Sequence, residues 1–118
     1  MLLRENRLKN KKDFKKIFEQ GKGFRQDFLF LKIIKNNLGK TKFGFVVSKK
    51  VSKKAVTRNK IKRQLREIVR NKLKKEQIKI GIDGVLVVLQ DIDGKDFKEI
   101  EKVIGTLFKK AGVIINNK

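Results

Sequence analysis

The residues best suited to do chemistry in this chain are cations, gathered in one segment. Residues 49–75 carry thirteen of the chain's 33 Lys and Arg residues and a single acid, Glu67. Apolar residues recur through the same segment at the spacing of one helix face, at Ile61, Leu65, Ile68, Val69 and Leu73. Like charges four residues apart on a helix repel each other by about a few tenths of a kcal/mol per pair. A polyanion would relieve that repulsion, so the pattern favours nucleic acid as the partner.

The predicted nucleic-acid contacts are the polar side chains that such a helix, and the turn before it, would present. Arginine is the better bidentate ligand of phosphate, and four arginines occur in this helix of an otherwise Lys-rich chain. The alternative is a merely solvated basic face. The predicted RNA-binding residues are Lys49, Lys50, Arg58, Asn59, Lys60, Lys62, Arg63, Arg66 and Arg70.

Two aromatic residues, Phe14 and Phe18, lie four residues apart in a second, shorter helical pattern. They could belong to the core. They could instead form a platform on which bases stack, a contact worth roughly 1–3 kcal/mol per base. Spacing alone leaves both interpretations open.

Several kinds of site are excluded by composition. The chain has no His and no Cys, so it can have no imidazole base, thiolate nucleophile, disulfide or His/Cys zinc site. Its acids gather near the C-terminal end, where residues 79–118 hold seven Lys and six acids, so no catalytic residue and no metal site are predicted. The longest apolar run, residues 85–89, is far too short to span a membrane, and charge follows the first residues at once. We expect a cytoplasmic protein without a membrane partner.

The chain of 118 residues, with a net charge of +21, is expected to form one RNA-binding domain over residues 1–118. Asn36 to Lys40 should form a turn that joins the first two assigned strands into a hairpin. Asp96 and Glu99 form a capping-box pair, and Gly112 should end the last helix. Helices are predicted over residues 13–20, 55–76 and 96–112, and strands over 27–35, 41–48 and 84–90.

The segments 47–50 (VSKK) and 55–67 (AVTRNKIKRQLRE) closely resemble the signature of the bacterial ribonuclease P protein subunit. Arg7-Leu8, Asp13-Phe14, Phe18 and Gly21 resemble the N-terminal pattern of that family. The sequence departs from the family at Lys60, where Arg is usual, and at Lys53-Lys54, where Gly-Asn is usual. The second departure removes the Asn that could cap the basic helix.

The resemblance implies a fold for this chain, and separate roles for the protein and for an RNA. The fold is a small α/β (α+β) two-layer sandwich, with three helices and a mixed sheet in the order α-β-β-β-α-β-α. General topology favours a right-handed crossover through the basic helix, but the family implies a left-handed one, which we adopt.

In this family the catalyst is a large RNA, and the protein assists it in removing the 5′ leader of precursor tRNA. The resemblance therefore implies that Mg²⁺ belongs to the RNA-containing holoenzyme and that the protein holds no cofactor. Phe14 and Phe18 would line the leader cleft. The residues implied to face the catalytic RNA are Arg58, Asn59, Lys62, Arg63 and Arg66. The alternatives are a ribosomal or general RNA-binding protein, a nucleoid DNA-binding protein, or a stand-alone nuclease.

Overall fold

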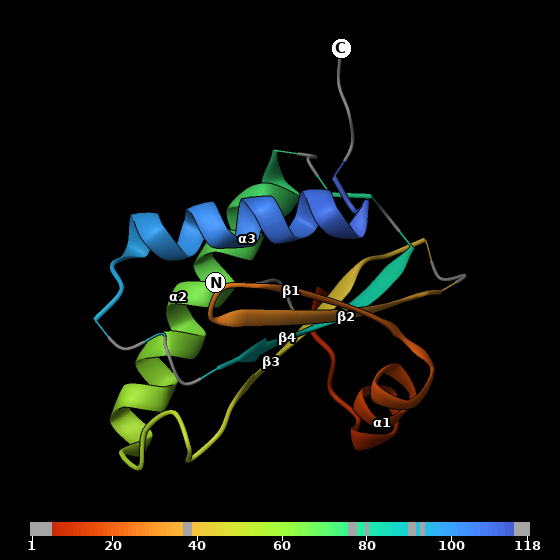
Figure 1. Cartoon of the computed structure of the whole chain (residues 1–118). Helices are drawn as coiled ribbons and strands as arrows, with labels where there is room; N and C mark the ends of the chain where they lie inside the picture. The colour runs from red at the N-terminus through yellow and green to blue at the C-terminus, as the bar shows by residue number, and fades with distance from the viewer. Residues whose placement is uncertain are drawn as a thin grey trace.

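The computed structural model describes residues 6–36, 39–75, 78–79, 81–89, 92 and 94–114. It has three helices and four strands in the predicted order α-β-β-β-α-β-α (Figure 1). The elements are α1 (Lys11–Gln20), β1 (Lys22–Gln26), β2 (Leu29–Lys35), β3 (Lys42–Val47), α2 (Ala55–Lys74), β4 (Ile82–Val88) and α3 (Phe97–Ala111).

The four strands form one mixed sheet in the order β1-β2-β4-β3. β2 is antiparallel to both β1 and β4, whereas β3 runs parallel to β4. β4 is central, and its residues Val85 and Leu86 are fully buried on opposite faces, as its continuous apolar run predicted. The connection from β3 to β4 passes through α2.

The predicted hairpin between residues 27–35 and 41–48 is wrong, because β4 lies between β2 and β3. The hairpin partner of β2 is β1, to which no residues were assigned from the sequence. A tight turn containing Asp27, at φ 51°, joins the two strands. Left-handed backbone is uncommon outside glycine, although Asp adopts it more readily than most residues.

The helices cover both faces of the sheet. On β3, Phe43 points to the face covered by α2 and α3, and its ring stacks on Phe108 of α3 at 5.6 Å between centroids. The next residue, Gly44, faces α1 on the opposite side. The main core lies between the sheet and the α2–α3 layer, while Leu8, Ile17 and Val85 form a smaller buried cluster under α1.

The ends of α3 confirm the predicted caps. The Asp96 carboxylate accepts a hydrogen bond from the Glu99 backbone N–H at 2.9 Å, and the Asp96 backbone N–H donates to Glu99 Oε1 at 3.4 Å. Gly112 ends the helix in the left-handed conformation, at φ 70°.

Candidate nucleic-acid interface

Helix α2 buries the apolar stripe that its sequence predicted. Leu65, Ile68 and Val69 are fully buried, and Ile61 and Leu73 pack partly exposed against the same core. Burial of this stripe fixes the rotation of α2 about its axis, and the opposite face is left to solvent.

None of the nine predicted RNA-binding residues is buried. Lys49 and Lys50 are exposed in the turn before α2. On the helix, the exposed residues are Asn59, Lys60 and Arg63, and the half-buried ones are Arg58, Lys62, Arg66 and Arg70. The sequence therefore predicted correctly that these side chains reach the surface together.

Two of these arginines also have structural contacts. Arg58 Nη1 donates to the carbonyl oxygen of Ser52 at 2.9 Å, which ties the start of α2 to the preceding loop. Arg70 pairs with Glu67 at 3.5 Å. Since Glu67 is the only acid in the α2 sequence, most of the helix's positive charge is not neutralised by acids of α2 itself.

The N-terminus of α2 adds to the positive potential. Its N-cap residue is Lys54, whose side chain makes no capping hydrogen bond, and the first turn contains no acid. The loss of a capping side chain follows from the Lys53-Lys54 departure in the sequence. Unpaired backbone N–H groups and the helix dipole favour an anion at this end.

A second surface lies across the sheet, where α1 crosses a row of paired residues on β1, β2, β4 and β3. That row is Gly23, Lys32, Val85 and Gly44. Phe14 lies over Gly44, and Ile17 packs on Val85. At the other end of α1, the Lys32 ammonium donates to the carbonyl oxygen of Phe18.

Phe14 and Phe18 occupy different environments within this surface. Phe18 is 39% exposed, whereas Phe14 is half-buried beside the Leu8–Ile17–Val85 cluster. Phe14 therefore packs against the core cluster while keeping some exposure, and Phe18 is the more accessible of the two aromatic residues.

Sequence reasoning missed two members of the same surface, Phe30 and Lys32 of β2. Both are half-buried, and both lie beside Gly23, where a Cβ atom would come within 2.8 Å of the Phe30 ring and 3.7 Å of Lys32 Cε. Their spacing of two residues, which places them on one face of a strand, was the available signal. We name Phe14, Phe18, Phe30 and Lys32 the aromatic surface.

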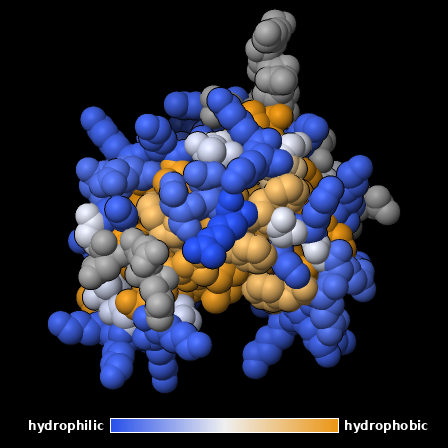
Figure 2. All heavy atoms as spheres, in the orientation of Figure 1, coloured by the Kyte–Doolittle hydropathy of each residue, from blue (hydrophilic) through white to orange (hydrophobic). Residues whose placement is uncertain are grey.

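The aromatic surface and the cationic face of α2 belong to opposite sides of the sheet. Figure 1 shows α1 and α2 on either side of the strands, well apart. Figure 2 shows hydrophilic side chains around the margins of the visible face, with apolar residues between them. The two surfaces therefore face different directions, and a partner bound at one of them leaves the other accessible.

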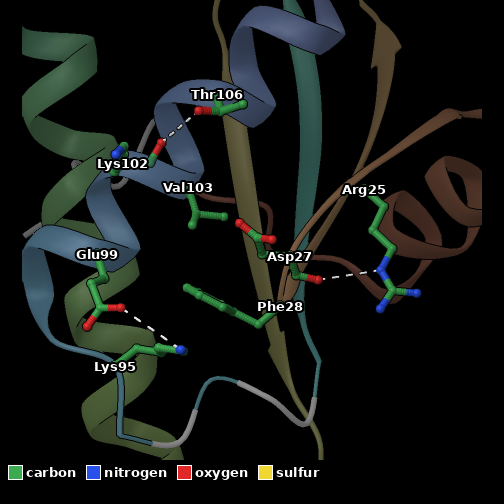
Figure 3. A pocket seen from close by; sticks show the side chains of 8 residues that line it. All are labelled: Arg25, Asp27, Phe28, Lys95, Glu99, Lys102, Val103 and Thr106. Atoms are coloured by element: carbon green, nitrogen blue, oxygen red, sulfur yellow. Dashed lines mark hydrogen bonds and ion pairs between the residues drawn. The ribbon is translucent and has the colours of Figure 1, made fainter.

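One cavity in the described part of the chain involves neither surface. It has a volume of about 620 Å³ and opens between the β1–β2 turn and the first half of α3 (Figure 3). Two of its charged groups pair, Lys95 with Glu99 at 3.9 Å, and Arg25 Nε donates to the backbone carbonyl oxygen of Asp27 at 3.4 Å. The lining residues are Arg25, Asp27, Phe28, Lys95, Glu99, Lys102, Val103 and Thr106.

Across the described ranges, no group of three or more His, Cys, Asp or Glu side chains is placed to hold a metal ion. In that same part of the chain, no helix combines the length and hydropathy needed to cross a bilayer.

Comparison with known proteins places the chain in a family. The model of the family described as Ribonuclease P matches residues 2–112. The ribonuclease P protein component of a Pseudanabaena species is 41% identical, over 99% of this chain and 100% of the relative.

Solved structures agree with the sequence comparison. The Staphylococcus aureus ribonuclease P protein superposes with a TM-score of 0.83 at 28% identity, covering 93% of this chain and 98% of that one. The Thermotoga maritima ribonuclease P protein gives 0.79 at 30% identity, covering 94% and 98%. The order of elements and the crossover through α2 are those of these structures, as the resemblance implied. The chain therefore belongs to the bacterial ribonuclease P protein family, the protein component of the ribonucleoprotein endonuclease that matures the 5′ ends of tRNA.

Proposed function

We propose that α2 binds the catalytic RNA of ribonuclease P, while the aromatic surface binds the single-stranded 5′ leader of precursor tRNA. The observation that carries this proposal is the placement of Arg63 and Phe18: both are exposed, and they belong to helices on opposite faces of the sheet. A protein built in this way lies between two RNA molecules and contacts both.

Charge explains what the α2 side contributes. A catalytic RNA and its tRNA substrate are both polyanions and repel each other. A protein of net charge +21 placed between them lowers that repulsion and releases counterions from both. The nine cationic and amide side chains predicted from the sequence would make these contacts, and Mg²⁺ would be held by the RNA.

Stacking explains what the α1 side contributes. Phe18 presents part of its ring to solvent, and the Lys32 ammonium lies beside its carbonyl group. An exposed ring stacks with any base, so it suits leaders of varied sequence, and a nearby cation suits the phosphates between those bases. We place the protein in the cytoplasm, where precursor tRNA is made in bacteria.

The test is cleavage of precursor tRNA at low Mg²⁺ concentration by the catalytic RNA alone, the protein alone, and the two together. The proposal expects cleavage at the mature 5′ end that is fastest with both components and absent with the protein alone. It also expects the holoenzyme to bind precursor tRNA more tightly than mature tRNA.

The alternatives give different results in the same experiment. A general RNA-binding protein would bind precursor and mature tRNA equally and would not stimulate cleavage. A stand-alone nuclease would cut without the catalytic RNA.

A further inference from the structure

In the described part of the chain, two large hydrophobic side chains are exposed to solvent, Phe18 and Val56. Phe18 belongs to the aromatic surface. Val56 is 80% exposed and lies in the second residue position of α2. Single exposed apolar residues are common on proteins, so the surroundings of Val56 decide what its exposure signifies.

Val56 lies on the midline of the outward face of α2, at the N-terminal end of the helix. At 100° per residue it is about 180° from Leu65, which is fully buried. Its neighbours one and two turns along the helix are Asn59, Lys60 and Arg63, and all three are exposed. An apolar side chain is thus surrounded by the polar groups that are proposed to hold RNA.

Folding gives no reason for a valine here. The side chain has little cover in the folded protein, so its exposure to water changes little on folding. Its β-branch also makes it a poorer helix former than alanine by a few tenths of a kcal/mol, roughly. A contact made only in the complex would account for it.

We infer that Val56 packs against an unstacked base of the catalytic RNA, while Asn59, Lys60 and Arg63 hold the neighbouring phosphates. Proteins read RNA mainly at unpaired nucleotides, whose bases are splayed out and accessible to side chains. Small apolar side chains also pack against bases in nucleic-acid complexes. This inference rests on the proposed binding of the catalytic RNA by α2, and adds to it a contact that carries no charge.

The first test compares Val56→Ala with Lys60→Ala in binding to the catalytic RNA over a series of salt concentrations. Loss of two methyl groups from an apolar contact should weaken binding about 5- to 15-fold at every salt concentration, with the slope unchanged. Lys60→Ala should instead reduce the salt slope by about 1. Thermal unfolding of Val56→Ala should match or exceed that of the wild type, because the side chain is exposed.

Unchanged affinity of Val56→Ala at all salt concentrations would overturn the inference, and so would a loss confined to low salt. Failure of the wild-type protein to bind the catalytic RNA would instead remove the proposed function on which the inference rests. The two failures are therefore distinguishable.

A second test uses the absence of cysteine from the sequence. Val56→Cys creates a unique thiol that can carry a photoactivated aryl azide, with Lys74→Cys at the far end of α2 as the matched exposed control. The inference expects the label at position 56 to cross-link to an unpaired nucleotide of the catalytic RNA that the label at position 74 does not reach. Cross-links only to base-paired segments, or the same nucleotides from both positions, would contradict it.

Discussion

The ring of Phe14 lies directly against the backbone of Gly44. A Cβ atom at Gly44 would be 2.4 Å from Phe14 Cζ and 2.5 Å from Cε1, closer than any real Cβ contact. The absence of a side chain at Gly44 of β3 therefore sets how closely α1 approaches the sheet. It also sets where Phe18, one turn further along α1, presents its ring.

Gly44→Ala should destabilise the protein and weaken leader binding together. The added methyl group must displace Phe14 from a packed site, and overpacking of this kind costs about 1–3 kcal/mol. Urea unfolding measures the first effect, and the difference between precursor and mature tRNA binding measures the second. Gly105→Ala is the matched control: its Cβ would meet only Lys72 Nζ, at 3.7 Å, so removal of a helical glycine should stabilise the protein by roughly 0.5–1 kcal/mol. Equal effects of the two substitutions would show that the Phe14–Gly44 contact has no special role.

Phe18→Leu should separate leader binding from stability. The substitution keeps apolar bulk at an exposed position but removes the aromatic face, so precursor tRNA should bind the holoenzyme more weakly by roughly 1–3 kcal/mol. Mature tRNA, which lacks the leader, should bind as before. Phe14→Leu should lower the midpoint of thermal unfolding more than Phe18→Leu does, because Phe14 packs against a buried cluster. If Phe18→Leu stays folded and binds both RNAs normally, position 18 does not contact the leader.

Arg63→Ala and Arg66→Ala should each weaken assembly with the catalytic RNA by about 1.5–3 kcal/mol, the worth of a hydrogen bond to a charged group. Lys109→Ala removes the same charge from the exposed side of α3 and should have little effect. Lys110→Ala should also leave assembly unchanged. It is the weaker control, since Lys110 Nζ donates to the carbonyl oxygen of Arg25 at 2.9 Å. The substitution therefore also removes a hydrogen bond within the fold. Similar losses of affinity in Arg63→Ala and Lys109→Ala would show that net charge, and not the position of the cations on α2, drives binding.

Binding of the catalytic RNA should depend steeply on salt. If about 6–10 phosphates are contacted, affinity should fall roughly 10³- to 10⁵-fold between 50 and 200 mM salt. Titrations at several salt concentrations give the slope directly. A flat response would be incompatible with an interface built on the cations of α2.

Lys72→Met should stabilise the protein at neutral pH. Burial between α2 and α3 lowers the pKa of Lys72, nearby Lys75 and Lys109 lower it further, and Glu101 opposes them. A lysine with a lowered folded pKa destabilises the fold while it is charged in both states, that is, at any pH below the folded pKa. This cost disappears as the pH rises from the folded pKa to the ordinary lysine value. Thermal unfolding should thus show a benefit of Lys72→Met at pH 7 that shrinks in strong alkali. A benefit that does not change with pH would assign it to packing alone.

Local patterns in the sequence predicted the helices and the cationic face well. The periodicity of α2 located Leu65 and its neighbours in the core, and therefore also the cations on the outside. The cap of α3 was predictable because Asp96 and Glu99 interact within one turn of helix.

The sheet was less predictable, because its pairing depends on distant segments. Strand β1 contains Lys22, Gly23, Arg25 and Gln26, a composition that does not stand out as a strand. β1 is an edge strand that pairs only with β2, so its other edge has no partner strand in the sheet. The insertion of β4 between β2 and β3 is set by which apolar run can be buried on both faces, and the amino-acid sequence between β2 and β3 contains no sign of it. Phe30 and Lys32 were missed for the same reason, since their role depends on α1 crossing the sheet above them.

The central position of β4 also sets the order in which this molecule can fold on the ribosome. β2 and β3 are synthesised well before β4, yet each has β4 as its neighbour in the sheet. Until residues 82–88 emerge, β2 and β3, which carry the core residues Leu31 and Phe43, have no central strand between them. The apolar stripe of α2 then has no complete sheet to pack against. A nascent chain that ends before β4 thus displays its basic segment without a fixed shape, and the cationic face becomes rigid only when a strand that follows it in the chain is inserted.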